Sequence, residues 1–350
     1  MSRPNVAIIG GGRFGRTLEK VLHEADHADV AVCAREGGVY PRRSIETLNK
    51  ADVVVYAVSS TALRQASLNT SDHIRPDSIV LSAVKGLDYR EGALRTMTDV
   101  LAERLLTRTI GAISGPNLEA EINKGLPTYT AIALPLPEET KARHARLGIA
   151  HELCNLFTTG SFRAIVEPDL LGLEYGGALK NILAIAAGIV EGYFGDARNT
   201  QGSILMFGLH DLHSVYAHVS HKRTRTPRKL PEVFLGDAFA TATSAGSRNY
   251  LFGKLLGSQL QHGPASADEI LCHMDGETVE GLPTLEAVHK YALAHTLDLL
   301  IVPQLHGLVS GNKSMREAIA AITNAEVAFE KQRYKDFLRE GKPLRDKQHP

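Results

Sequence analysis

The sequence begins with a short apolar run that stops at a cluster of glycines, "VAIIGGGRFG", residues 6–15. Gly10, Gly12 and Gly15 have G-x-G-x-x-G spacing, and they stand between a strand-like run and a helix predicted near 14–25. In this arrangement Gly10 permits a tight turn, Gly12 lets the backbone approach a pyrophosphate, and Gly15 allows close packing of helix on strand. Free N–H groups at the helix N-terminus would face the anion. The pattern predicts a dinucleotide-binding loop, although three glycines can also form a purely structural turn.

Further apolar runs follow at intervals, among them "ADVVVYAV", "SIVLSAVKG", "RTIGAIS" and "TYTAIALP". They are rich in Val and Ile and are separated by helical stretches, which is typical of a parallel sheet buried on both faces. We therefore predict an α/β Rossmann-type domain over residues 1–170, with a doubly wound, mostly parallel sheet. Nearly everything after about residue 173 has helical patterns, so residues 171–350 are predicted to form an all-α domain. The basic stretch "HKRTRTPRKLPEV", residues 221–233, is predicted to be an exposed loop.

Composition and charge exclude several classes of protein. The chain has 350 residues with 39 basic and 39 acidic side chains, so its formal net charge is zero and no global field attracts nucleic acid. The N-terminus leaves no room for a secretory signal, and the Ala-rich segment 178–190 is too short for a membrane span and carries Lys180. We expect a cytoplasmic protein with neither a nucleic-acid partner nor membrane insertion.

The cysteines and histidines do not predict a metal site. Three cysteines, Cys33, Cys154 and Cys272, are odd in number and far apart, so they match neither a disulfide framework nor a zinc spacing. Four histidines lie between His210 and His221, but on one helix the outer pair would be about 16 Å apart, too far for one ion. Exposed or capping histidines are the simpler interpretation.

Arg35 lies about 20 residues beyond the glycines, where the second predicted strand ends. An arginine there can stack on adenine or contact the 2′-phosphate of NADP, whereas an acidic residue would favour the ribose hydroxyls of NAD. Glu36 follows directly, so the choice between NAD and NADP stays open. A solvated surface arginine is the alternative.

Two other predicted strands end in polar residues. Lys85 follows one strand in "SAVKGL", and Gly115 and Asn117 follow another in "AISGPN". Open α/β sheets bind ligands at the carboxyl ends of their strands. Separately these are ordinary strand ends, and together they outline one cleft.

The helical half contains an unusual lysine. "LEYGGALKNILAIAAGI", residues 173–189, places Lys180 and Asn181 among small apolar side chains. A lysine ammonium is rarely buried without partners, so a fold has little structural reason to place one there. We infer that Lys180 serves function rather than packing.

A second polar segment, "GDAFATATSAGSRN", follows later in the helical half. Asp237 and Thr241 are four residues apart and would share one helix face. Ser247 is predicted to cap a new helix. Arg248, beside that helix N-terminus, would make a good phosphate site because its planar fork adds to the backbone donors. Alone, this segment would equally suit a surface cap.

Seven motifs together resemble one family. "GGGRFG", "AVKGL", "SGPN", "GLPT", "LEYGGALKNILAIAAGI", "GDAFATATSAGSRN" and "TVEGLPT" occur in order between residue 5 and about residue 325. This set resembles the NAD(P)-dependent glycerol-3-phosphate dehydrogenase family, bacterial type. The resemblance implies reversible reduction of dihydroxyacetone phosphate, a small phosphorylated three-carbon substrate, to sn-glycerol 3-phosphate. It also implies a homodimer, to which Ala-rich segments such as "LAIAAGI" and "EAIAAITNAEVAFE" would contribute.

The resemblance also implies a role for individual residues. Its catalytic positions are Lys180 as the acid/base, with Lys85, Asp237 and Thr241. Its cofactor contacts are Gly10, Gly12, Arg13, Phe14, Gly15, Arg35, Lys85, Glu119, Arg248, Thr278 and Glu280. Its substrate contacts are Lys85, Gly115, Asn117, Lys180, Asn181, Asp237, Ser247, Arg248 and Asn249.

The chemistry fits these assignments. Hydride delivered to a carbonyl carbon leaves charge on the oxygen, and a positioned ammonium can stabilise and protonate it. Burial and the neighbouring charge of Lys85 should lower the pKa of Lys180, while Asp237 should oppose that shift.

The chain departs from the family pattern at several positions. Phe14 stands where the family often has Trp, Glu119 where Ala is common, and Phe207 where an arginine is expected. The approach to Asp237 is shortened to "VFLGD" around Gly236. A related phospho-ketone as substrate, or a non-catalytic dinucleotide-binding regulator, therefore remains an alternative. The presence of Lys180 argues for the enzyme, because a pure sensor needs no acid/base lysine.

Overall fold

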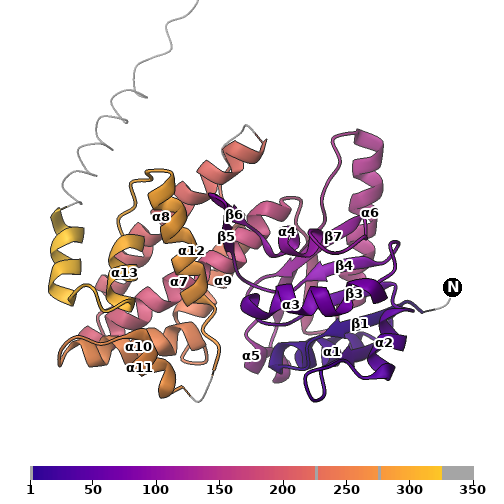
Figure 1. Ribbon diagram of the computed structural model, residues 1–350, viewed down its shortest axis with the longest axis horizontal. Coiled ribbons are helices and arrows are strands. Elements are labelled where there is room, and N and C mark those ends of the chain that lie inside the picture. The colour runs from indigo at the N-terminus through magenta and orange to yellow at the C-terminus, as the bar shows by residue number, and fades with distance from the viewer. Residues whose placement is uncertain (1–2, 225–227, 275–276, 325–350) are drawn as a thin grey trace, which may run out of the picture.

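The computed structural model describes residues 3–224, 228–274 and 277–324. Figure 1 shows two parts side by side, a sheet covered by helices on the right and a purely helical part on the left. The predicted fold class, a doubly wound α/β part followed by an α part, is confirmed.

The N-terminal part is built on a seven-stranded sheet with the order β2-β1-β3-β4-β7-β8-β9. The strands are β1 (Asn5–Ile9), β2 (Asp29–Cys33), β3 (Val53–Tyr56), β4 (Ile79–Ser82), β7 (Thr109–Ser114), β8 (Thr128–Ala133) and β9 (Phe162–Val166). Neighbouring strands are parallel except β7 and β8, which run antiparallel. A short antiparallel hairpin of β5 (Asp88–Arg90) and β6 (Ala93–Arg95) stands apart from this sheet.

Helices cover both faces of the sheet. They are α1 (Arg13–Ala25), α2 (Arg42–Leu48), α3 (Ser60–Thr70), the 3-10 turn η1 (Ser71–His73), α4 (Met97–Ala102), α5 (Glu119–Asn123) and α6 (Thr140–Phe157). Successive side chains of a strand point to opposite faces, so Ile8 packs in the core under α1 and α6, and Ile9 packs in the core under α3 and α4. This double burial explains why the strands are continuous apolar runs in the sequence.

The remaining described residues contain helices and no strand. The helices are α7 (Leu170–Phe194), α8 (Arg198–Thr224), α9 (Glu232–Ala242), α10 (Arg248–Leu260), α11 (Ala267–Cys272), α12 (Gly281–Ala294) and α13 (Val302–Val309). By length and composition α7 alone among the described helices is apolar enough to cross a membrane, but the qualifying stretch is buried entirely inside the protein.

One prediction for this part is wrong at its ends, and a second is wrong. Within the predicted loop 221–233, residues 228–231 have neither helix nor strand, as expected, but α8 continues to Thr224 with His221, Lys222 and Arg223 in its last turn, and α9 begins at Glu232. Cations near a helix C-terminus are stabilised by the helix dipole, so these basic residues extend the helix instead of ending it. Residues 225–227 lie outside the described residues.

The segment "LAIAAGI" was expected to contribute to a subunit contact, but its residues are buried within this one chain. The last six residues of "EAIAAITNAEVAFE" also lie outside the described part.

Glycines hold α7 directly against α10. A Cβ atom at Gly188 would overlap the backbone oxygen of Tyr250, and one at Gly253 would overlap the backbone oxygen of Ile185. The two helices therefore meet backbone to backbone, with no side chain able to fit between them. This contact fixes the position of α7 within the helical part.

The N-terminal half of α7 meets the sheet. A Cβ atom at Gly177 would collide with the Oγ atom of Ser114 at the end of β7 and lie 3.7 Å from Cγ of Lys85. Leu173 joins a small apolar cluster with Ala112 of β7. The small residues of α7 thus let it pass close to the ends of β4 and β7, one turn before Lys180.

Candidate active site

Lys180 is buried, with 5% of its surface exposed, and its ammonium bonds two described side chains. Its Nζ atom donates hydrogen bonds to Oδ1 of Asp237 and, over 2.6 Å, to Oγ1 of Thr241. Asp237 and Thr241 lie one turn apart on α9, as their spacing predicted, and the Thr241 hydroxyl donates to the backbone oxygen of Asp237 over 2.7 Å. The helix pair α7 and α9 therefore builds a polar pocket for one ammonium group.

Lys85 joins this group from the sheet part. It follows β4, and its Nζ atom donates to the backbone oxygen of Gly115 and to Oδ2 of Asp237, each over 2.9 Å. Asp237 thus accepts from one lysine at each carboxylate oxygen. The four predicted catalytic residues, Lys180, Lys85, Asp237 and Thr241, form one connected cluster where the two parts meet.

The environment of Lys180 lowers its pKa to about 7. Burial is the largest cause because it penalises the charged form, the charge of Asp237 opposes it, and the charge of Lys85 adds to it. These are the directions expected from the sequence. A lysine with this pKa can hold or release a proton near neutral pH, which is what general acid/base chemistry requires.

A chain of side-chain amides lies next to the lysine cluster. The Nδ2 atom of Asn249 donates to Oδ1 of Asn181 over 3.0 Å, and the backbone N–H of Gly281 donates to Oδ1 of Asn249 over 2.8 Å. Ser247 caps α10, as predicted, by accepting from the backbone N–H of Tyr250. These bonds fix the N-terminus of α10.

The glycine loop has the geometry of an anion-binding turn. Gly10 has φ +126°, and a Cβ atom there would collide with the backbone oxygen of Ala57. A Cβ atom at Gly15 would collide with the backbone oxygen of Gly10, so this glycine permits close packing of α1 on β1. At Gly12, by contrast, a Cβ atom would meet no described atom within 4 Å. The N-terminus of α1 is therefore open on this side, which fits a pyrophosphate. Phe14 packs partly against the core between the sheet and α1.

Four charged side chains gather in front of this loop. Arg13 pairs with Glu277, and its Nε atom lies 3.5 Å from Oε1 of Glu119. The same Glu277 pairs with Arg248, whose Nη1 atom is 3.3 Å from Oε2. The structure thus brings three predicted residues, Arg13, Glu119 and Arg248, to one place. Glu277 was not predicted, and its only signal in the sequence was an acidic residue directly before Thr278.

Glu280 reaches the sheet part. Its carboxylate accepts from the backbone N–H of Ser60 over 3.1 Å and from the Ser60 hydroxyl, at the first turn of α3. Burial raises the pKa of Glu280, while these hydrogen bonds oppose the shift. Ser60 was also missed, because nothing near it in sequence marks it. Thr278, predicted beside the cofactor, is exposed.

Asn117 has a buried side-chain oxygen without a hydrogen-bond donor among the described residues. Its Nδ2 atom donates to Oγ1 of Thr130 over 2.9 Å, but its buried Oδ1 atom finds no donor among the described residues. A buried carbonyl oxygen without a donor is rare and suits a ligand hydroxyl. Gly236 faces this turn, since a Cβ atom there would lie 3.9 Å from Cγ of Pro116.

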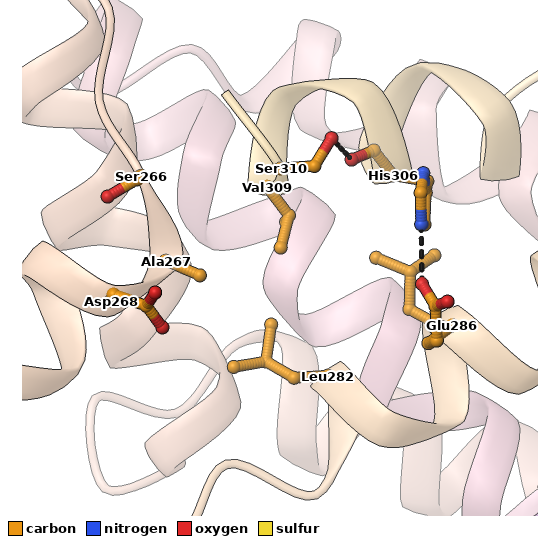
Figure 2. Close-up of a pocket in the computed structure, with 9 residues that line it drawn as sticks. Ser266, Ala267, Asp268, Leu282, Glu286, His306, Val309 and Ser310 are labelled. Carbon is orange, nitrogen blue, oxygen red and sulfur yellow. Dashed lines mark hydrogen bonds and ion pairs between the residues drawn. The ribbon is translucent and has the colours of Figure 1, made fainter. Parts of the chain in front are cut away.

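Arg35 lies next to the glycine loop, and Phe207 lies away from the cleft. Arg35 is exposed beyond the end of β2, where the backbone N–H of Gly10 donates to the backbone oxygen of Cys33, and its acidic neighbour Glu36 is paired with Arg43. Phe207 lines a separate apolar cavity between α7, α8 and α13. A further cavity of about 260 Å³ between α11, α12 and α13 contains none of the predicted site residues; in it the Nε2 atom of His306 contacts Oε2 of Glu286 over 2.6 Å (Figure 2).

Comparisons with known proteins identify the family. Residues 42–140 match the description of the NAD-dependent glycerol-3-phosphate dehydrogenase N-terminus, and residues 169–320 match its C-terminus. A glycerol-3-phosphate dehydrogenase [NAD(P)+] of Fusobacterium nucleatum is 30% identical over 340 residues, covering 90% of this chain and 95% of that protein. The chain belongs to the NAD-dependent glycerol-3-phosphate dehydrogenase family.

Other glycerol-3-phosphate dehydrogenases agree with this result. The [NAD(P)+] enzyme of Synechocystis is 31% identical over 345 residues, covering 95% of this chain and 96% of that protein. The crystal structure of a glycerol-3-phosphate dehydrogenase from Coxiella burnetii has a TM-score of 0.74 and 22% identity, covering 92% of this chain and 98% of that one. At this identity the structural likeness shows the fold alone. The family expected from the sequence motifs is confirmed.

Proposed function

We propose that this member of the glycerol-3-phosphate dehydrogenase family interconverts dihydroxyacetone phosphate and sn-glycerol 3-phosphate with NAD or NADP in the cytoplasm. One observation carries the proposal. A buried lysine with a pKa near 7, Lys180, lies in a complete polar pocket at the junction with a dinucleotide-type sheet. A buried lysine needs a counter-charge such as Asp237 for structural reasons alone, but a second cation, Lys85, on the same carboxylate has no packing explanation.

The cofactor would be held on the sheet side of the cleft. The backbone around Gly12 and the N-terminus of α1 suit its pyrophosphate, and Arg35 suits its adenosine end. Glu280, already bonded to the first turn of α3, stands at the same edge of the sheet. When bound as the reduced form, the nicotinamide supplies the hydride for the ketone carbon.

Lys180 would manage the proton. Its ammonium form donates a hydrogen bond to the ketone oxygen and gives up a proton as negative charge develops there. In the reverse direction the neutral amine takes the proton from the alcohol. Asp237 and Thr241 hold Nζ in place, and Lys85 adds positive charge near the same oxygen.

The substrate phosphate would bind at the N-terminus of α10. Arg248 is the first residue of that helix and its side chain is 44% exposed, so its guanidinium is available to a ligand. A helix N-terminus and an arginine fork are both favourable for phosphate. The unused Oδ1 atom of Asn117 suits a hydroxyl of the same substrate.

The test is an assay of purified protein with NADH or NADPH and dihydroxyacetone phosphate, followed by the absorbance of the reduced nicotinamide. We expect turnover, and we expect Lys180→Ala to lower it by about 10²- to 10⁴-fold, the usual contribution of a general acid. Cofactor binding by that variant should stay near normal. Lys290→Ala removes an exposed lysine on α12 and is the matched control, expected to keep full activity.

Two other outcomes would replace this function. Turnover only with a related phospho-ketone would change the substrate and leave the chemistry intact. Cofactor binding without turnover on any phospho-ketone would favour the non-catalytic regulator.

The division into domains 1–170 and 171–350 and the homodimer are also part of the proposal. The change from sheet to helices between Val166 and Leu170 supports that boundary. Exposed apolar side chains on the helical part, including Phe194 and Met206, support a subunit contact there. Light scattering coupled to gel filtration would measure the oligomeric state. Neither nucleic acid nor a membrane is expected as a partner.

A further inference from the structure

A single carboxylate connects the two arginines that stand nearest the expected phosphates. Glu277, between α11 and α12, pairs with Arg13 directly after the glycine loop and with Arg248 at the start of α10. Both arginines stand at helix N-termini, where an anion is stabilised by the helix dipole and by free N–H groups. Glu277 supplies a negative charge at both places, and Glu119 adds a second carboxylate beside Arg13.

The exposure of these side chains allows a ligand to replace Glu277. The side chains of Arg13, Glu277 and Arg248 are 57%, 36% and 44% exposed. Ion pairs this accessible to water are weak and exchange their partners readily. The cofactor pyrophosphate as a whole and a phosphate monoester each carry about two negative charges, more than one carboxylate, and a phosphoryl group can accept two parallel hydrogen bonds from a guanidinium. It therefore competes well against Glu277 for either arginine.

We propose that Glu277 is a specificity-determining residue that neutralises Arg13 and Arg248 in the ligand-free protein and must be displaced by the phosphoryl groups of cofactor and substrate. This inference rests on the proposed function of the same cleft. A ligand without a phosphoryl group has nothing to offer the arginines in exchange, so it leaves the ion pairs intact and binds poorly.

The shared carboxylate also couples the two ligands. When the pyrophosphate of the cofactor takes Arg13, its charge repels Glu277, which then releases Arg248 as well. The substrate phosphate meets an arginine that is already free, so the cofactor strengthens substrate binding. By thermodynamic reciprocity the substrate strengthens cofactor binding by the same factor.

Glu119 distinguishes this role from simple support of Arg13. Its Oε1 atom lies 3.5 Å from Nε of Arg13, so Arg13 keeps one acidic neighbour when Glu277 loses its charge. If Glu277 served only to orient the arginines for their ligands, neutralising it would weaken binding. If it competes with the ligands, neutralising it tightens binding.

The test compares wild type with Glu277→Gln by isothermal titration calorimetry, using NADH, NADPH and sn-glycerol 3-phosphate. From the usual strength of exposed ion pairs we expect the variant to bind each ligand about 1.5- to fivefold more tightly. The factor by which cofactor strengthens sn-glycerol 3-phosphate binding should shrink. The gain in affinity should fall as salt screens the ion pairs.

Glu46→Gln is the matched control, because it removes the same charge from an exposed pair with Arg42 on α2. We expect it to bind all three ligands like wild type. Unchanged or weaker binding by Glu277→Gln, in a wild type that turns over dihydroxyacetone phosphate, would overturn the inference. Failure of the wild type to bind sn-glycerol 3-phosphate or to turn over the ketone would instead count against the proposed function.

Discussion

The charge of Asp237 sets the proton affinity of Lys180, and Asp237→Asn tests this directly. The carboxylate lies between two ammonium groups and is buried, so little solvent screens it. An opposite charge at this range shifts a pKa by about one to three units. Its removal should therefore lower the pKa of Lys180 from about 7 toward about 5. At pH 7 the ammonium form would then fall from about half to about one hundredth of the enzyme.

The assay is the pH profile of kcat/KM for dihydroxyacetone phosphate at saturating cofactor. In wild type, ketone reduction should decline as pH rises through about 7, because the acid form of Lys180 disappears. In Asp237→Asn the same decline should begin one to three pH units lower, as the shift of about this size predicts. Thr241→Val is the matched neutral control: it removes one hydrogen bond that Nζ can donate both as an ammonium and as a neutral amine, and it leaves the charge of Asp237 in place. Its decline should stay near pH 7.

The same variant should show a stability change with a definite sign. Breaking a buried ion pair costs about 3–5 kcal/mol when the remaining charge stays buried. In Asp237→Asn this full cost applies at low pH, where Lys180 is still protonated. It becomes smaller at higher pH, where Lys180 loses its proton. Urea unfolding of wild type and Asp237→Asn at acidic and at alkaline pH measures the loss of unfolding free energy under both conditions. In the pH profile of kcat/KM, Asp237→Asn could instead show a lower maximum with its decline still near pH 7. Asp237 would then only position Lys180, and the electrostatic reasoning would be wrong.

Two further predictions concern groups outside the lysine cluster. Burial raises the pKa of Glu174 on α7 from 4.5 to about 7, so the stability that the protonated carboxyl contributes is fully present below pH 4.5 and is lost as pH rises through about 7. In urea unfolding, Glu174→Gln should remove a pH dependence of the unfolding free energy of about 3 kcal/mol across this range. An unchanged dependence in the variant would contradict the assignment. If exposed Arg35 contacts the 2′-phosphate of NADP, Arg35→Ala should weaken NADPH binding about 10- to 100-fold and NADH binding little, since a hydrogen bond to a charged group is worth about 1.5–3 kcal/mol. Fluorescence titration with NADPH and with NADH measures both affinities. An equal loss of affinity for the two cofactors would assign Arg35 to adenine stacking.

The sheet strands and the lysine were predictable because their signals are local. An apolar run that stops at glycines, or a lysine within an apolar helix, can be recognised from a few consecutive residues. The antiparallel pairing of β7 and β8 was not predictable, because a strand buried on both faces has the same apolar pattern whichever way its neighbour runs. The β5–β6 hairpin was missed because its three-residue strands are too short for an alternation pattern.

The residues missed at the cleft have partners far away in the sequence. Glu277 is 264 positions from Arg13, and Glu280 is 220 positions from Ser60. No spacing rule for a helix or turn reaches across such separations. The motifs could place Glu280 at the site. They could not identify Ser60 as its partner, because that contact depends on how the helical part packs against the sheet.

The glycine contact between α7 and α10 limits how the protein can move. One end of α7 is locked to α10 and the other lies against β7 through Gly177, so α7 belongs to both parts at once. A hinge motion of the helical part relative to the sheet must therefore turn about this helix, and atoms near a pivot travel least. Lys180 lies in the middle of α7, so opening and closing of the cleft would carry the arginines and Glu277 farther than the lysine that exchanges the proton.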